Sequence, residues 1–178
     1  ADEEPRLQAW LSQGYHGEME YMARHGMLRA RPAELQPGTR AVISVRMNYL
    51  PTHAAIARTL QQPDQGYISR YALGRDYHKV LRQRLKQLAE RIESAVGHYG
   101  YRPFVDSAPL LERPLAAQAG LGWVGKHSLL LNQQAGSFFF LGELLVDLPL
   151  PADSPVGEQC GNCVACMTIC PTAAIVAP

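Results

Sequence analysis

The sequence lacks the features that mark exported and membrane-spanning proteins. Its 178 residues contain no apolar run long enough to cross a bilayer. The N-terminal residues, Ala1-Asp-Glu-Glu-Pro5, are acidic and polar, unlike a secretory leader. There is no internal repeat and no low-complexity tract. These absences predict a globular, soluble protein of the reducing cytoplasm that does not associate with membranes.

An excess of charge of one sign is also missing. The 17 Lys and Arg residues balance 16 Asp and Glu residues, for a net charge of +1. Composition alone therefore does not indicate a nucleic-acid-binding protein. Lysine is scarce and occurs only at Lys79, Lys86 and Lys126, so most basic residues are arginines, which suit phosphate and carboxylate groups. The simpler interpretation of these arginines is an exposed, salt-bridged surface.

Cysteine is confined to one short segment near the C-terminal end. Cys160, Cys163, Cys166 and Cys170 are followed by Pro171, which gives the spacing C-x2-C-x2-C-x3-C-P of bacterial iron–sulfur proteins. A structural zinc site normally joins two separated Cys pairs, and cysteines this close are poorly placed for disulfides. The segment therefore predicts 4Fe–4S ligation. In such runs the fourth cysteine usually binds a second cluster, so we expect its partners to lie beyond Pro178.

The other segments predict a mixture of helices and strands. Helices are expected at residues 6–25 in two pieces, 77–97 and 113–119. Strands are expected at residues 41–49, 104–106, 127–132 and 138–146, the last two joined by a turn at 133–136. Because strands and helices do not alternate strictly, the pattern favours an α+β (mixed α/β) fold. Prolines near residue 150 suggest a linker between a domain of residues 1–150 and the start of a second at 151–178.

Gly120, Gly122 and Gly125 match the dinucleotide fingerprint G-x-G-x-x-G. The run follows an expected helix and leads into an expected strand, which is the reverse of the order that a dinucleotide site needs. It also matches most of a P-loop, but His127 occupies the position of the magnesium-binding Ser or Thr. The run is more typical of a glycine helix cap followed by a tight turn. A glycine-rich surface for a large flat ligand is the alternative.

Two polar groups are candidates for catalysis. Asp76, Tyr77 and His78 lie at the start of the 77–97 helix. Asp76 could simply be its N-cap, and Tyr77 and His78 could be ordinary residues of the first turn. Asp106 follows a short strand, a common place for catalytic side chains, although a turn or cap role is the alternative. A carboxyl group that donates a proton needs a raised pKa, from burial or from a neighbouring carboxylate. Glu112 is close to Asp106 in sequence.

Taken together, these stretches resemble the epoxyqueuosine reductase family. The matching segments are residues 44–49, 70–78, 104–109, 120–127, 136–143 and 160–171. The resemblance covers essentially the whole chain. A ferredoxin-type cysteine run is generic by itself, but its combination with this glycine, histidine and aspartate pattern is specific.

The resemblance implies an oxidoreductase that converts epoxyqueuosine to queuosine at the wobble position of the tRNA anticodon. It implies cobalamin and two 4Fe–4S clusters as cofactors, with electrons passing from the clusters to cobalamin. The cobalamin domain of the family looks like a nitroreductase core, and residues 151–178 would begin a ferredoxin-like module. The implied partners are tRNA carrying epoxyqueuosine and an unidentified low-potential electron donor, and the implied state is a monomer.

The resemblance also implies roles for individual residues. Asp106 matches the family's proposed proton donor, and Tyr77, His78 and Arg113 match residues of the same pocket. Cobalamin contacts are expected from Met47, Asn48, Tyr71, Asp106, Lys126, His127, Asn132, Gly136, Ser137 and Gly142. Cluster ligands are expected at Cys160, Cys163, Cys166 and Cys170. Since the family carries further cysteines and helical repeats after this run, we expect the chain to be truncated and inactive alone, with a trimmed N-terminus.

Two other functions fit parts of the sequence. One is a corrinoid and iron–sulfur reductase acting on another small substrate, such as an organohalide. Reductive dehalogenases usually carry an export signal, which argues against this alternative. The other is a non-catalytic electron-transfer ferredoxin with an accessory domain, for which the non-ferredoxin part is unusually large. A search for bound cobalamin would separate the leading hypothesis from the ferredoxin.

Overall fold

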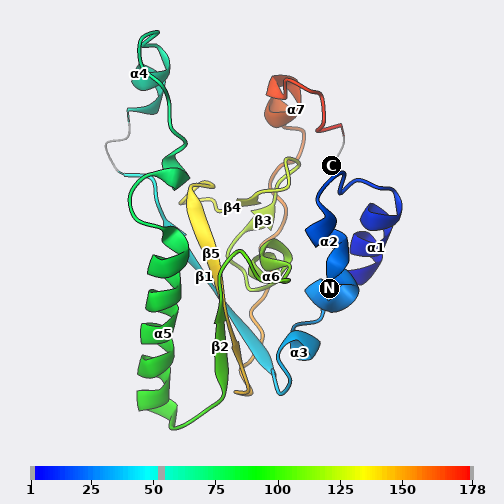
Figure 1. Cartoon of the computed structure of the whole chain (residues 1–178), viewed down its shortest axis with the longest axis vertical. Helices are drawn as coiled ribbons and strands as arrows, with labels where there is room; N and C mark the ends of the chain where they lie inside the picture. The colour runs from blue at the N-terminus through cyan, green and yellow to red at the C-terminus, as the bar shows by residue number, and fades with distance from the viewer. Residues whose placement is uncertain (1–2, 52–54, 177–178) are drawn as a thin grey trace.

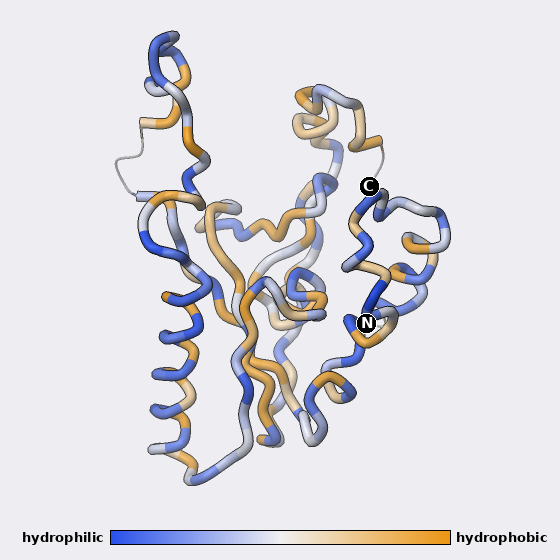
Figure 2. The backbone as a smooth tube through the Cα atoms, viewed as in Figure 1, coloured by the Kyte–Doolittle hydropathy of each residue, from blue (hydrophilic) through white to orange (hydrophobic). Residues whose placement is uncertain are grey.

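A three-stranded antiparallel sheet, in the order β1-β5-β2, lies at the centre of the molecule. Its strands are β1 (Ala41–Asn48), β5 (Phe139–Val146) and β2 (Tyr101–Phe104). The structure is a computed structural model that describes residues 3–51 and 55–176. β5 is the middle strand and is almost wholly hydrophobic, as Figure 2 shows, because it is covered on both faces.

Helices and a small second sheet surround this centre (Figure 1). The second sheet pairs β3 (Trp123–Val124) with β4 (Leu130–Leu131). The helical segments are α1 (Glu4–Ser12), α2 (Glu20–Arg24), η1 (Gly26–Ala30), α3 (Pro32–Leu35), α4 (Ile56–Leu60), η2 (Arg70–Ala72), α5 (Tyr77–Val96), α6 (Glu112–Gln118) and α7 (Ala165–Ile169). The predicted mixed α/β class is confirmed, as are the two-piece N-terminal helix and the long helix that begins at Tyr77.

Strands β1 and β2 both run antiparallel to β5, so they finish toward the end at which β5 begins. β1 pairs with β5 along its full length, from Ala41 opposite Val146 to Asn48 opposite Phe139. β2 pairs with the same strand on its other side and stops where Phe104 lies opposite Glu143. We call the end at which β1 and β2 finish and β5 begins the site end.

Helix α5 covers one face of the sheet. It begins with Asp76, whose side chain accepts the backbone N–H of His78 at 3.0 Å, so the predicted N-cap is confirmed. Its buried stripe is Leu81, Leu85 and Ala89, which packs against β5. Gly142 on β5 permits this close approach, because a Cβ there would lie 3.1 Å from side-chain atoms of Leu81 and Leu85.

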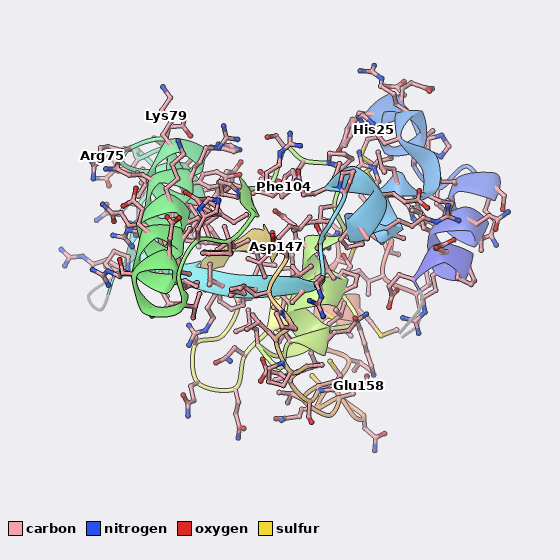
Figure 3. The ribbon with its side chains drawn as sticks, turned by 90° about the horizontal axis from the view of Figure 1, so that it is seen from below. His25, Arg75, Lys79, Phe104, Asp147 and Glu158 are labelled. Carbon is pink, nitrogen blue, oxygen red and sulfur yellow. The ribbon has the colours of Figure 1, made fainter. Side chains whose placement is uncertain are left out.

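Helix α6 covers the opposite face. Its fully buried Ala116 belongs to a cluster with Leu130 and Phe139, while Leu145 and Phe104 form a second cluster nearby. The N-terminal helices lie beyond α6, on the far side of the molecule from α5, and Figure 3 shows Phe104 between these two flanks. The sheet is therefore buried between layers, and its site end is the place where polar groups gather.

The glycine run after α6 has the predicted role of a helix cap. Gly120 has a φ of +73°, and the N–H of Leu121 reaches back to the carbonyl of Ala116 at 3.0 Å. A Cβ on Gly122 would lie 1.9 Å from the carbonyl oxygen of Leu131, so β4 can approach only a glycine. β3 lies within the run and β4 follows it, so the run leads into a strand and not into a helix, as the sequence indicated.

The predicted pairing of residues 127–132 with 138–146 is wrong. β4 pairs with β3, with Trp123 opposite Leu131, while β5 pairs with β1 and β2. The cause lies in the turn, where the Asn132 side chain accepts the N–H groups of Gln134 and Ala135 and closes a local loop. β5 then leaves this loop to satisfy its backbone groups on two other strands.

The strand expected at residues 104–106 lies earlier, at 101–104. It ends at Phe104 because Asp106 adopts a φ of +51°, which is incompatible with an extended strand. Across the described ranges, no helix is both long and apolar enough to cross a bilayer.

Candidate active site

Three predicted catalytic side chains meet at the site end of the sheet. The Tyr77 hydroxyl donates a hydrogen bond to Oδ2 of Asp106, and Nε2 of His78 lies 3.3 Å from the same oxygen. We call Tyr77, His78 and Asp106 the polar cluster. The two helix residues are far from Asp106 in sequence, and the packing of α5 beside β2 brings them together. The Asp106 side chain is 56% exposed, so the cluster is open to a substrate.

Ring stacking and an N-cap fix the two α5 residues of the polar cluster. The Tyr77 ring stacks on Phe140 of β5 at 3.9 Å between centroids and on His78 at 4.0 Å. Nδ1 of His78 lies 2.9 Å from Oδ1 of Asp76, so the imidazole is held between two carboxylates. This hydrogen bond to His78 is the main reason why the pKa of Asp76 is lowered. A protonated His78 donates to both carboxylates at once.

Tyr77 acts in this arrangement as a hydrogen-bond donor. Burial is the largest cause that raises the pKa of its phenol, and the hydrogen bond to Asp106 raises it further. The hydroxyl therefore keeps its proton at neutral pH. Tyr77 can hold the Asp106 carboxyl in place but cannot itself serve as a base.

Asp106 is held through its backbone as well. Its φ of +51° is uncommon for a residue other than glycine. Its N–H donates to Oε1 of Glu112, the first residue of α6, at 2.6 Å. Sequence proximity alone did not place these two residues in contact, and the structure does. The carboxylate neighbour expected for a proton donor is therefore present, although it binds the backbone and not the side chain of Asp106.

Glu143 is a polar residue of the site region that the sequence reasoning missed. It is fully buried on β5, beside the start of α6, and faces Glu112. Burial is the largest cause that raises the pKa of Glu143, followed by the charge of Glu112 and a hydrogen bond to it. Burial also raises the pKa of Glu112, against the opposing effect of the Asp106 N–H. The signal in the sequence was a single Glu within an otherwise apolar strand.

Arg113 lies one residue after Glu112, and its exposed guanidinium reaches the segment before β4. It donates to the backbone carbonyl of Ser128 and, at 3.1 Å, to the hydroxyl of the same residue. Its charge lowers the pKa of Glu112, so it lies close to the buried carboxyl groups. A role of Arg113 in holding substrate stays a prediction.

Several predicted cobalamin contacts lie at or near the site end. Met47 and Asn48 are the last residues of β1, and Gly136 and Ser137 precede β5. Tyr71 in η2 is 53% exposed and close enough to affect the pKa of Tyr77. Their role in cofactor binding stays a prediction.

The structure gives other predicted contacts a local role. The amide nitrogen of Asn132 donates to the carbonyl of Leu121 at 2.8 Å, and Nδ1 of His127 accepts the N–H of Leu129 at 3.2 Å. Nζ of Lys126 donates to the carbonyl oxygens of Gly161 and Cys163, at 2.8 and 3.0 Å. Lys126 therefore joins the cysteine segment to the segment before β4. Gly142 faces α5, and a cofactor contact at these four positions stays a prediction.

Two grooves flank β1. One, of about 550 Å³, lies between β1 and α5 and includes Met47 and Asn48 in its lining. The other, of about 680 Å³, lies on the opposite side of the strand, beside α6 and residues 150–153. Neither groove includes Tyr77, His78 or Asp106, so the polar cluster lies on an open surface at the end of the sheet.

Exposed apolar side chains occur in the parts of the chain that precede α5 and β5. Both parts lead to the site end. They are Ile68, Tyr71, Leu73, Val124, Leu129 and Phe138. A large ligand with an apolar face would cover such side chains, and an open surface suits it better than a closed pocket.

Of the four cysteines, two precede the short helix α7, one lies within it and one follows it. The N–H of Cys163 donates to the carbonyl of Cys160 at 2.9 Å, Cys166 is in α7 and Cys170 follows it. In residues 3–51 and 55–176, no three His, Cys, Asp or Glu side chains are gathered as a metal site. The pKa of Cys170 is lowered to about 7, first by the Thr172 hydroxyl and then by backbone N–H groups. Free thiols in this spacing suit iron–sulfur ligation.

Comparisons with known proteins support the family resemblance. Residues 29–107 match the family model described as "Epoxyqueuosine reductase QueG, DUF1730". The chain is 73% identical to an epoxyqueuosine reductase of Salmonella typhimurium, over 98% of this chain and 46% of the relative. It is 71% identical to that of Escherichia coli, over 100% of this chain and 47% of the relative. The resemblance to epoxyqueuosine reductase is confirmed. The chain spans about half the length of these curated relatives.

Solved structures of epoxyqueuosine reductase share the fold. The Streptococcus thermophilus structure matches with a TM-score of 0.80 and 30% identity, over 98% of this chain and 46% of that one. A structure with an epoxyqueuosine-modified tRNA-Tyr stem loop matches with a TM-score of 0.80 and 27% identity, over the same shares. An epoxyqueuosine reductase structure from Bacillus subtilis, described with its catalytic loop, named by an aspartate, swung out of the active site, matches with a TM-score of 0.73 and 26% identity, again over 98% and 46%.

Proposed function

We propose that the chain is the catalytic, cobalamin-binding part of an oxidoreductase that reduces epoxyqueuosine to queuosine at the wobble position of the tRNA anticodon. The observation that carries this proposal is the meeting of Tyr77, His78 and Asp106 at an open end of the sheet. It occurs in a chain with the sequence of epoxyqueuosine reductases along its whole length. The tRNA-bound relative supports tRNA as the substrate.

Asp106 is the proposed proton donor. Removal of the epoxide oxygen as water consumes two electrons and two protons, and the departing oxygen is the group that must be protonated. Asp106 presents an exposed carboxyl, while Tyr77 and His78 hold its Oδ2. A relative whose catalytic loop, named by an aspartate, can leave the active site supports this role, because Asp106 also lies on the loop after a strand.

The residues at the site end fit a large cofactor with an apolar face. We propose that residues 1–150 form a nitroreductase-like core in which Met47, Asn48, Tyr71 and Ser137 hold cobalamin against the exposed apolar side chains. The same role is proposed for Asp106, Lys126, His127, Asn132, Gly136 and Gly142. When bound, cobalamin would supply the low-potential electrons for the reduction. The chain's own residues then orient the substrate, protonate the oxygen and restrict water.

The cysteine segment is the proposed electron entry. Residues 151–178 would begin a ferredoxin-like module in which Cys160, Cys163, Cys166 and Cys170 are ligands of two 4Fe–4S clusters. Lys126 supports this function, because its two hydrogen bonds attach the segment to the region before β4. Arg113 would bind substrate or a tRNA phosphate. We further propose a cytoplasmic monomer supplied by a low-potential electron donor.

The decisive test replaces Asp106 with Asn in the full gene product, reconstituted with cobalamin and clusters. We expect the conversion of epoxyqueuosine-tRNA to queuosine-tRNA to slow by roughly 100-fold or more, since a positioned proton donor contributes that much. The ultraviolet–visible spectrum of bound cobalamin should not change. The exposed turn residue Asp64 supplies a matched control, and Asp64→Asn should react like the unmodified protein. Absence of cobalamin binding, together with normal turnover of Asp106→Asn, would refute the proposal.

A further inference from the structure

A pair of carboxyl groups, one fully buried and one partly buried, lies next to the loop that carries Asp106. Glu143 is fully buried in the middle of β5, between Ser44 on β1 and Phe104 on β2. Within the described part of the chain, neither of its carboxyl oxygens accepts a hydrogen bond from an N–H or O–H group. The polar group that Glu143 faces is the carboxyl of Glu112. We call Glu112 and Glu143 the carboxyl pair.

The carboxyl pair can be satisfied by one proton. Two ionised carboxylates only accept hydrogen bonds, so they cannot bond to each other, and burial disfavours a second charge. Glu143 is the more buried member and lacks any other donor, so it is the group that holds the proton. Glu112 then accepts two hydrogen bonds, from the Glu143 hydroxyl and from the N–H of Asp106 at 2.6 Å.

Asp106 needs such support because its backbone is in an unfavourable conformation. A φ of +51° at a residue other than glycine persists only where the surroundings hold it. Tyr77 and His78 hold the side chain, and Glu112 holds the backbone. The bond to Glu112 therefore ties the orientation of Asp106 to the carboxyl pair.

We propose that Glu112 and Glu143 form a positioning pair that shares one proton: the protonated Glu143 donates a hydrogen bond to Glu112, and Glu112 holds the backbone of Asp106 in the orientation that aims its carboxyl at Tyr77 and His78. The proposal rests on the role of Asp106 as proton donor. Glu143 is fully buried and Glu112 is partly buried, and both act on the reaction only through Asp106, so both are positioning residues.

The proposal predicts that the Asp106 loop loosens when the pair loses its proton. Two adjacent negative charges would repel each other, which favours movement of Glu112 away from Glu143 and releases the Asp106 N–H. Charged groups near the pair, or on the same face of the sheet, affect the pH at which this happens. They are Asp106 on the loop, Arg113 on α6, Arg46 on β1 and Arg102 on β2.

Amide hydrogen exchange of Asp106 tests the role of Glu112 without reference to activity. In the reconstituted full gene product we expect Glu112→Ala to speed exchange at this amide by roughly tenfold or more, because a hydrogen bond to a charged acceptor is lost. Glu112→Gln keeps an acceptor oxygen and should retain most of the protection, which covers the case in which Glu112→Ala does not fold. The control is Glu158→Gln in the exposed linker, which Figure 3 shows at the periphery, well apart from Phe104.

Infrared spectroscopy and a pH profile test the role of Glu143. In an Asp106→Asn background, which removes any contribution of Asp106, a carbonyl stretch of a protonated carboxylic acid should persist at pH 8 and be absent when Glu143→Gln is added. The Gln amide donates to Glu112 and never ionises, so protection of the Asp106 amide should extend to higher pH. The pH at which the rate of epoxide reduction falls on the alkaline side should also be higher in Glu143→Gln.

The outcomes separate this proposal from the proposed function. Unchanged exchange at Asp106 in Glu112→Ala, or a carboxylic acid band that survives Glu143→Gln in the Asp106→Asn background, would overturn the positioning pair. Normal turnover of Asp106→Asn would instead overturn the catalytic role of Asp106, whatever the exchange measurements give.

Discussion

The two faces of the central sheet are built differently. On the α5 side, β5 contributes Leu144 and Val146 to an apolar cluster with Leu81 and Leu85. On the α6 side, the same strand buries Glu143 between two smaller apolar clusters. Alternation along a strand explains how one segment serves both faces. Only the α6 face carries a buried carboxyl, and that face adjoins the Asp106 loop.

This difference separates stability from function. The α5 face gains free energy from the removal of apolar surface from water. A buried carboxyl gives up part of that gain. In the proposed pair, Glu143 holds Glu112, which accepts the N–H of Asp106. On the α5 face, the free energy of unfolding should therefore depend on side-chain volume. On the α6 face, it should depend on whether Glu143 is protonated.

The largest effect on folding is expected from a cavity on the α5 face. Leu85 is 1% exposed, so Leu85→Ala should lower the free energy of unfolding by roughly 2–5 kcal/mol. Urea denaturation followed by circular dichroism measures this loss. Arg82→Ala, at an exposed position of the same helix, should change the free energy by about 0.5 kcal/mol or less. Similar losses in the two variants would remove the distinction between the faces.

The α6 face should show a pH dependence that depends on Glu143. Its pKa is raised in the folded protein, so the folded state binds more protons than the unfolded state above the ordinary Glu pKa. Stability should therefore fall as pH rises, by up to about 1.4 kcal/mol per pH unit for one proton. Urea unfolding between pH 6 and 9 should give a smaller slope for Glu143→Gln. Equal slopes would show that Glu143 titrates normally.

A smaller effect is expected where α5 approaches the sheet most closely. Gly142→Ala adds a methyl group that would meet side-chain atoms of Leu81 and Leu85 at 3.1 Å, so these side chains must shift. We expect a loss of about 1 kcal/mol, because crowding exceeds the gain from a less flexible unfolded chain. Thermal unfolding measures the loss. Gly66→Ala, where a Cβ would meet no atom within 4 Å, is the control, and a larger loss there would contradict this explanation.

The sequence predicted the elements whose signals are local. The apolar stripe of Leu81, Leu85, Leu88, Ile92 and Ala95 was enough for α5, and the β-branched run was enough for β1. It could not predict that β4 pairs with β3, because the preference of β5 for two other partners depends on segments far away in the chain.

The candidate site likewise has features that the sequence predicted and features that only the structure revealed. The residues Tyr77, His78 and Asp106 were found from the sequence, but their hydrogen bonds follow from the packing of α5 beside β2. Glu143 was missed because a lone Glu in an apolar strand does not reveal which group it faces.

By itself, the sequence determined the mixed α/β class, the cysteine run, the long capped helix and the family resemblance, since each depends on residues close together or on their order. Only the tertiary structure decided the strand pairing, the strained Asp106 and the meeting of Glu112 with Glu143. These features depend on register and on layer packing, which bring together side chains that no local pattern connects.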